Sequence, residues 1–79
     1  MRPSDYQKAL AREVIDQREF LGFTRQDLAN RAGVTAPTIG NIERGDNLPS
    51  LTTILKIADA LGLYPAEMLD AVEARILAD

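Results

Sequence analysis

Apolar side chains recur at spacings of three and four residues along almost the whole chain. That spacing predicts amphipathic helices, and no stretch alternates apolar and polar residues for long enough to predict a strand. The pattern divides into five segments that we expect to be helical, over residues 4–21, 25–32, 36–44, 51–61 and 66–77. The chain is therefore predicted to form an all-α fold, a compact five-helix domain that spans residues 1–79.

Capping signals stand at the boundaries of these segments. Residues whose side chains can accept a hydrogen bond from the first turn stand at the starts of the first four segments, namely Ser4 or Asp5, Thr24, Thr35 and Ser50. Glycines, which adopt the left-handed conformation that ends helices, follow the same four segments at positions 22, 33, 45 and 62. Pro37 falls in the first turn of the third segment, where its missing N–H costs nothing.

The same pattern predicts which residues form the core. In the first helix the expected apolar stripe consists of Tyr6, Leu10, Val14 and Leu21, with Ile15 beside it. In the fourth helix the residues expected to face the core are Leu51, Ile54, Leu55, Ala58 and Leu61. Both sets follow the helical period.

Composition excludes several classes of function. The 79 residues include no cysteine and no histidine, so neither a disulfide nor one of the usual zinc ligand sets is expected. No glycine-rich phosphate loop or evident pair of catalytic carboxylates is present, so we expect neither an enzyme nor a cofactor. No apolar run approaches the ~20 residues that cross a bilayer, and no signal peptide is visible, so a cytoplasmic location is expected.

The distribution of charge is uneven. The net charge is −3, which by itself argues against a nucleic-acid partner. Residues 1–44, however, hold seven basic and six acidic side chains, whereas residues 45–79 hold two and six. A local basic patch in the first half therefore remains compatible with DNA, and the acidic half is a candidate surface for a protein.

Residues 25–44 are predicted to form two helices joined by a tight turn. Ala29 is small enough for the third helix to cross closely over the second, and Gly33 accepts a positive φ. Val34, Ile39 and Ile42 are apolar, as is required to hold the third helix on the rest. That helix is short and contains a proline and a glycine, so its stability is expected to come from packing.

The segment GFTRQDLANRAGVTAPTIGNIERGDNLPSLTTILKIADALG, residues 22–62, resembles the lambda-repressor-like (Cro/XRE-type) helix-turn-helix domain. The stretches TRQDLANRAGV, TIGNIERG and PSLTTILKIADALG occur in the family's order and spacing. The resemblance extends from Arg18 to Leu63. It implies a five-helix fold that binds double-stranded DNA, usually as a homodimer on a palindromic operator, with the third helix in the major groove.

The resemblance also implies which residues touch DNA. The base contacts would come from the exposed face of the third helix, Ala36, Pro37, Thr38, Gly40 and Asn41. Asn41 is the best direct reader, because its amide can pair with adenine at two atoms. The phosphate contacts would come from Thr24, Arg25, Thr35, Arg44 and Asn47. Lys8 and Arg12 are more readily explained as exposed helix charges.

Two further sets of residues are implied. Arg18 and Glu43 occupy positions that form a structural ion pair in the family, linking the first helix to the end of the third. In the last helix an apolar stripe is expected to exceed what the monomer core needs. We predict that a two-fold dimer interface forms there, from Leu63, Met68, Leu69, Val72 and Ile76.

Two functions remain open. The first is a sequence-specific DNA-binding transcriptional regulator, such as a phage-type repressor or a small controller protein, with RNA polymerase as a conceivable contact of the acidic half. The second is a protein-binding module, antitoxin-like or scaffolding, that keeps the fold but binds DNA weakly or not at all. The sparse recognition face and the net acidity favour the second, and the matches at Thr24, Arg25 and Arg44 favour the first.

Overall fold

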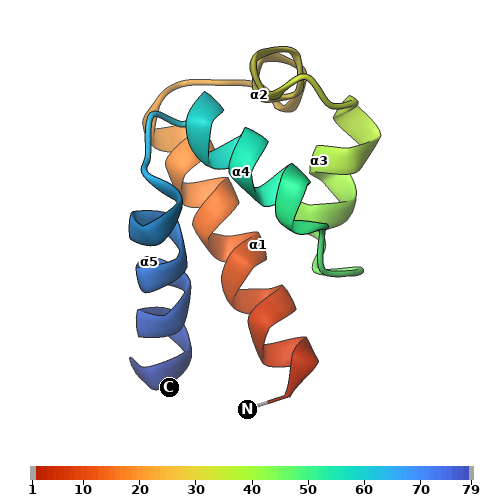
Figure 1. Cartoon of the computed structure of the whole chain (residues 1–79). Coiled ribbons are helices and arrows are strands. Elements are labelled where there is room, and N and C mark those ends of the chain that lie inside the picture. Colours follow the sequence, from red (N-terminus) through yellow and green to blue (C-terminus); the bar gives the residue numbers. More distant parts are fainter. Residues whose placement is uncertain (1, 79) are drawn as a thin grey trace.

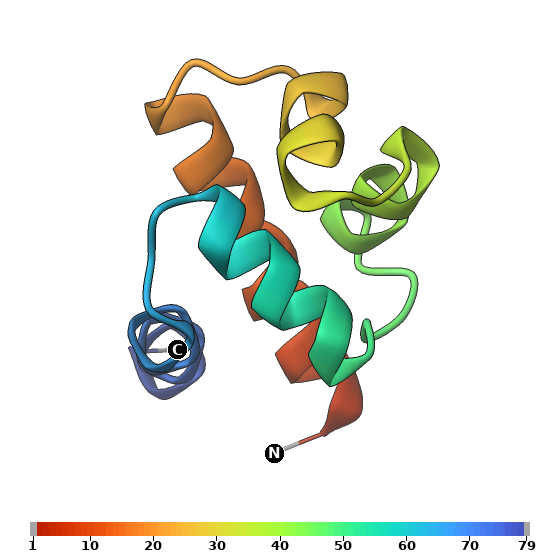
Figure 2. The same ribbon diagram turned by 45° about the horizontal axis from the view of Figure 1, so that its top comes forward.

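The computed structural model describes residues 2–78, and within that range the chain forms five α-helices and no strand. They are α1 (Pro3–Phe20), α2 (Arg25–Ala32), α3 (Ala36–Glu43), α4 (Leu51–Ala60) and α5 (Pro65–Ala78). In Figure 1, α1 runs through the centre and α4 crosses in front of it, while α5 lies along one flank and α3 lies on the other. Figure 2 shows α5 almost end-on, on the side of α4 remote from α2 and α3. The all-α prediction is confirmed.

The helix starts follow from side-chain caps. The Thr24 hydroxyl accepts from the Asp27 N–H at 3.0 Å, and the Thr24 N–H donates to the Asp27 carboxylate at 2.9 Å. The Thr35 and Ser50 side chains likewise accept the N–H of the third residue of α3 and of α4, as predicted. The start of α1 is a correction, because neither Ser4 nor Asp5 is its cap residue. Arg2 is, and its N–H donates to Asp5 at 2.9 Å.

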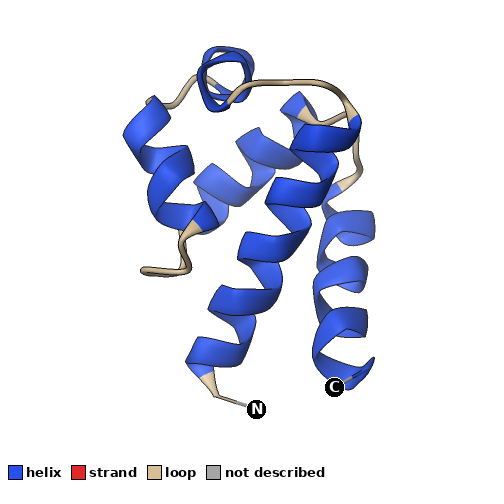
Figure 3. Cartoon of the chain, turned by 180° about the vertical axis from the view of Figure 1, so that it is seen from behind, coloured by secondary structure: helices blue, strands red, loops and turns tan. Residues whose placement is uncertain are grey.

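The core draws on all five helices. Its largest fully buried side chains come one from each, in chain order Val14, Leu28, Ile39, Ile57 and Met68. Because every helix contributes one such side chain, no helix is an appendage to a core built by the others. Figure 3 shows the same arrangement from behind, with α1 between α3 and α5. None of the described helices is long and apolar enough to cross a membrane.

Some predicted core residues lie outside the core. Tyr6 and Leu21 are 41% and 40% exposed, because they stand at the two ends of α1. Leu51 and Leu55 are also exposed and Ile54 is only half-buried, whereas Ala58 and Leu61 are buried as predicted, together with Ile57, which was not predicted. Apolar residues surround so much of α4 that the period alone does not identify the buried face.

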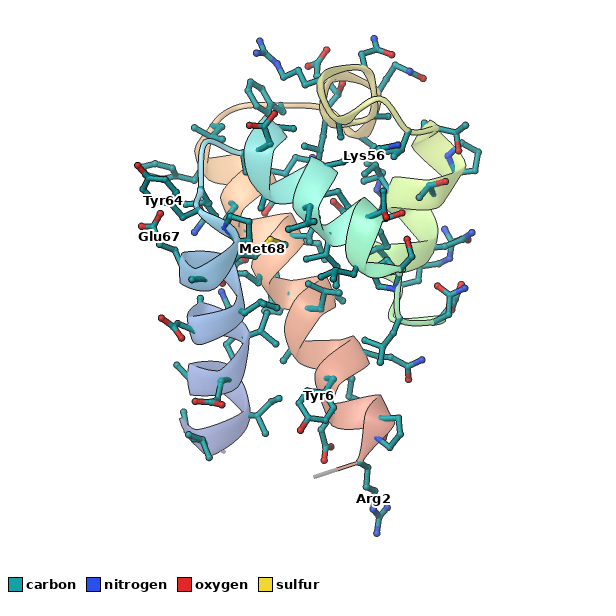
Figure 4. The ribbon with its side chains drawn as sticks, viewed as in Figure 1. Arg2, Tyr6, Lys56, Tyr64, Glu67 and Met68 are labelled. Carbon is teal, nitrogen blue, oxygen red and sulfur yellow. The ribbon has the colours of Figure 1, made fainter. Side chains whose placement is uncertain are left out.

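The predicted dimer stripe on α5 is wrong for Met68 and Val72. Both are buried inside this one chain, at 1% and 6% exposure, because α5 packs lengthwise on α1. In Figure 4 the Met68 side chain points inward from α5, whereas Tyr64 points away from the helices. Leu63 and Ile76 are partly buried against the same core. Of the predicted stripe, Leu69 alone is classed as exposed, at 45%.

Ion pairs fix α5 on α1. The Arg75 guanidinium donates to Glu13 at 2.9 Å and to Asp16 at 2.8 Å. The Glu13 side chain is only 4% exposed, so its charge requires this partner. Asp16 also accepts from Arg12, and this bond, with the one from Arg75, holds the pKa of Asp16 below its ordinary value.

Truncating the α5 core residue should destabilise the protein strongly. We expect Met68→Ala to lower the free energy of unfolding by about 2–5 kcal/mol, because it removes a fully buried side chain and leaves a cavity. Leu77→Ala, on the same helix but 66% exposed, is the matched control and should change it by no more than about 0.5 kcal/mol. Urea unfolding followed by circular dichroism measures both. Equal effects would contradict the described packing of α5.

Candidate nucleic-acid interface

The turn between α2 and α3 has the geometry that the sequence predicts. Gly33 ends α2 with φ of 71°, in the left-handed region that favours glycine. The next residue, Val34, donates its N–H to the Ala29 carbonyl at 3.0 Å, and Ala29 itself is fully buried. The chain therefore reverses within a few residues, and α3 is held across α2.

One edge of α3 is buried and the opposite edge faces outward. Ile39 and Ile42 are 0% and 2% exposed and hold the helix on the core. Pro37 is exposed on the other edge, and Thr38 and Asn41 are half-buried there. The short helix gains its stability from this packing, which leaves a polar edge in contact with solvent.

Two members of the predicted reading face do not lie on it. Gly40 is buried, because the Arg44 side chain covers it: a Cβ added at Gly40 would lie 3.1 Å from an Arg44 Nη1 atom. Gly40 therefore admits a side chain of its own helix rather than offering bare backbone to a ligand. Ala36 is partly buried and packs against the core, so it offers little surface outward.

The Glu43 carboxylate is the centre of the interior ion-pair network. Its side chain is 0% exposed, and Arg18 donates to its two oxygens at 2.7 and 3.1 Å. Arg18 also donates to the Phe23 carbonyl at 2.8 Å, which ties the loop before α2 to the same cation. The predicted pair of Arg18 and Glu43 is therefore present, and it joins α1, this loop and the end of α3.

Arg25 is a third member that the sequence analysis assigned elsewhere. Its Nε donates to Glu43 at 2.9 Å, although the side chain is 50% exposed. Burial raises the pKa of Glu43, but the hydrogen bonds and charges of Arg18 and Arg25 outweigh it, so the pKa lies below its ordinary value. Arg25 and Glu43 are 18 residues apart in the sequence. The spacing of residues within one helix or turn does not predict a contact over that separation.

The other predicted phosphate contacts are all exposed. They are Thr24, Thr35, Arg44 and Asn47. Thr24 and Thr35 cap the N-termini of α2 and α3, where backbone N–H groups and the helix dipole favour an anion. The Thr35 hydroxyl also lies 2.8 Å from that of Thr38, so these two side chains form one polar unit at the start of α3.

A second network crosses the far end of α3. Arg44 donates through Nε to Asp46 at 3.1 Å and through Nη2 to the Asn41 side-chain oxygen. Arg44 and Asp46 are 54% and 55% exposed, so the network lies at the surface beside the outward edge of α3. No interaction between Asn41 and Arg44 was expected. Their spacing of three residues on a helix was the available signal.

The chain matches known proteins over the range that contains these networks. A model of the helix-turn-helix family HTH_3 matches residues 14–68. An uncharacterized HTH-type transcriptional regulator of Haemophilus influenzae is 39% identical over 62 residues, which cover 78% of this chain and 63% of that protein. This chain thus spans less than two thirds of that relative's length. Another, from Methanothermobacter thermautotrophicus, is 47% identical over 49 residues, which cover 62% of this chain and 71% of the relative.

A solved structure agrees with the same assignment. The restriction-modification controller protein C.AhdI from Aeromonas hydrophila superposes with a TM-score of 0.75 at 31% sequence identity. The superposition covers 78% of this chain and 94% of the controller protein. The similarity in fold and the similarity in sequence therefore both indicate a helix-turn-helix protein.

Removing the buried carboxylate should destabilise the protein in a pH-dependent way. We expect Glu43→Gln to lower the free energy of unfolding by roughly 3–5 kcal/mol at neutral pH, because Arg18 then stays buried without its counter-charge. The folded-state pKa of Glu43 is lowered from 4.5, so its ionised form stabilises the fold above that pH. The contribution is lost as the pH falls through the lower folded-state pKa.

The difference between wild type and Glu43→Gln should therefore shrink as the pH is lowered below about 4.5, measured by urea unfolding across a pH series. Asp16→Asn is the control for a carboxylate in the surface-exposed ion cluster, and we expect a smaller loss from it. A Glu43→Gln difference that stays constant down to strongly acidic pH would contradict the assignment.

Proposed function

The chain belongs to the helix-turn-helix family HTH_3, and on that premise we propose that it is a transcriptional regulator that binds double-stranded DNA sequence-specifically, as a homodimer on a palindromic operator. The observation that carries the proposal is the division of α3 into two edges. Ile39 and Ile42 are buried, while Pro37, Thr38 and Asn41 border solvent. A helix held by one edge with its polar edge outward suits insertion into a major groove, which is wide enough to admit an α-helix.

Base contacts are assigned to Thr38 and Asn41, with Pro37 touching the groove wall. Ala36 and Gly40 are not assigned base contacts, because Ala36 packs against the core and Gly40 is buried beneath Arg44. The phosphate contacts are assigned to Thr24, Arg25, Thr35, Arg44 and Asn47, whose exposure leaves them accessible to a backbone. Arg25 serves twice under this proposal, since its Nε binds Glu43 and its side chain, which is 50% exposed, carries further N–H donors.

The proposed dimer uses the exposed apolar residues beside α5 rather than its buried stripe. Leu55, Tyr64 and Leu69 are 43%, 78% and 45% exposed. Leu55 and Tyr64 line one shallow hollow with Leu63 and Pro65. A second copy of the chain would cover this apolar surface by two-fold symmetry, the commonest arrangement of soluble oligomers.

The dimensions of the monomer suit that arrangement. In Figure 1, α3 and α5 lie on opposite flanks of α1. Recognition helices on successive major grooves stand about 34 Å apart, so each would lie ~17 Å from the two-fold axis. The monomer extends 32 × 22 × 21 Å, which accommodates that distance between the α5 flank and α3.

A second function, a protein-binding module, is favoured by the charge of the C-terminal half. Asp59, Glu67, Asp70 and Glu73 are exposed on α4 and α5, and an acidic surface repels DNA but suits a basic protein patch. In a regulator the same surface would be available to RNA polymerase or a cognate protein partner. Under this alternative α3 would not bind DNA at all, which makes the two functions separable by a DNA-binding measurement.

Binding to duplex DNA should depend steeply on salt. Fluorescence anisotropy with a labelled random-sequence duplex at low ionic strength should detect complex formation, with log affinity falling linearly with log salt. Arg25→Ala should reduce the magnitude of that slope by about 0.9, the value for one lost phosphate contact. Lys8→Ala is the matched control, because Lys8 lies beside Arg75 in a hollow between α1 and α5, and it should leave the slope unchanged. No binding at low salt would favour the protein-binding module.

The wild-type chain should sediment as a dimer at micromolar concentration. Leu69→Glu should shift it to monomer, because a buried carboxylate in an apolar interface is costly to desolvate. Leu77→Glu changes another exposed leucine of the same helix, two turns beyond Leu69, and it should remain dimeric. Analytical ultracentrifugation with and without DNA distinguishes these results, and a wild type that is monomeric in both conditions would rule the dimer out.

A further inference from the structure

We propose that Arg44 and Asn41 act together as one base-reading unit that presents only N–H donors, and that this unit selects guanine. The inference rests on the proposed DNA-binding function and changes the role of both residues within it. Asn41 was expected to read adenine and Arg44 to touch a phosphate. Their hydrogen bond to each other is incompatible with treating them as independent contacts.

The direction of that hydrogen bond is fixed by chemistry. A guanidinium donates and never accepts, so the Asn41 atom that faces Arg44 is the amide oxygen Oδ1. Asn41 then offers its Nδ2 group, with two N–H donors, to anything outside. Arg44 adds the N–H groups that do not bind Asn41 or Asp46, and its side chain is 54% exposed.

The absence of a side chain at Gly40 leaves room for the Arg44 guanidinium. Arg44 lies one helical turn beyond Gly40, and its guanidinium covers the glycine, with Nη1 at 3.1 Å and Cζ at 3.9 Å from where a Cβ would lie. A methyl group at position 40 would therefore require the guanidinium to shift by a few tenths of an ångström. Asp46 completes the restraint from the other side, by accepting from Nε at 3.1 Å.

The donor pattern decides which base fits. Adenine presents an acceptor at N7 and a donor at N6, so pairing with asparagine at two atoms requires both Oδ1 and Nδ2 to face the base edge. Here Oδ1 faces Arg44. Guanine presents two acceptors, N7 and O6, which match the N–H donors that Asn41 and Arg44 offer.

The position of the unit on α3 is compatible with base contact. Residues 37, 41 and 44 are separated by four and three positions, so they share one face of the helix. Pro37 and Asn41 border the outward edge already assigned to the groove. Arg44 extends that edge by one turn, and its side chain contacts both Asn41 on the helix and Asp46 in the following loop.

Selection from a random duplex pool tests the inference. The wild type should yield a half-site with a guanine preferred at one position. Arg44→Ala and Asn41→Ala should each reduce that preference roughly 5- to 150-fold, the range for one specific base contact, while the rest of the motif persists. Gly40→Ala keeps both side chains and requires the guanidinium to move by only a few tenths of an ångström, so the guanine preference should persist.

The outcomes separate this inference from the function on which it rests. If Arg44→Ala lowers affinity equally for all sequences, reduces the salt slope by about 0.9 and leaves the motif unchanged, Arg44 is a phosphate contact and the inference is overturned. If the wild type retains no duplex from the pool, the proposed function itself fails. Circular dichroism and urea unfolding of each variant confirm that it is folded, and Arg44→Lys, which keeps the charge but loses the planar fork, should resemble Arg44→Ala in base preference.

Discussion

The buried Glu43 carboxylate is the interaction on which the presentation of α3 depends. It accepts hydrogen bonds from Arg18 on α1 and Arg25 on α2, and Arg18 also holds the loop that precedes α2. Three helices and one loop thus meet at one anion. A buried ion pair is weak evidence for net stability, since desolvating the charges offsets much of their attraction. Its role here is better described as fixing the orientation of the short helix α3 relative to α1 and α2.

Much of the fold follows from local signals. Thr24, Thr35 and Ser50 cap the helices as their residue types predict, and Gly33 adopts the positive φ that the turn requires. These features depend on a few neighbouring residues, so the sequence reports them directly. The prediction of which residues are buried was wrong where contacts between helices determine burial. Met68 and Val72 fit a surface stripe equally well, and only the packing of α5 on α1 identifies them as core.

The candidate site was predicted to a lesser extent for the same reason. The pair of Arg18 and Glu43 followed from a family resemblance, but Arg25 joined it without any signal in its spacing. Gly40 was expected to lie on the exposed face of α3 and is instead buried beneath Arg44. Side-chain networks among Asn41, Arg44 and Asp46 depend on rotamers and mutual geometry, which a pattern of residue types does not encode.

The contribution of one fully buried side chain by each of the five helices has a consequence for the protein's lifetime in a cell. A helix that detaches must expose the side chain that it contributes to the common core, so each such opening costs free energy. Where opening and closing are fast relative to cleavage, proteolytic degradation follows the equilibrium population of the opened chain. The packing that holds α3 in position would then also set how quickly the cell removes the protein.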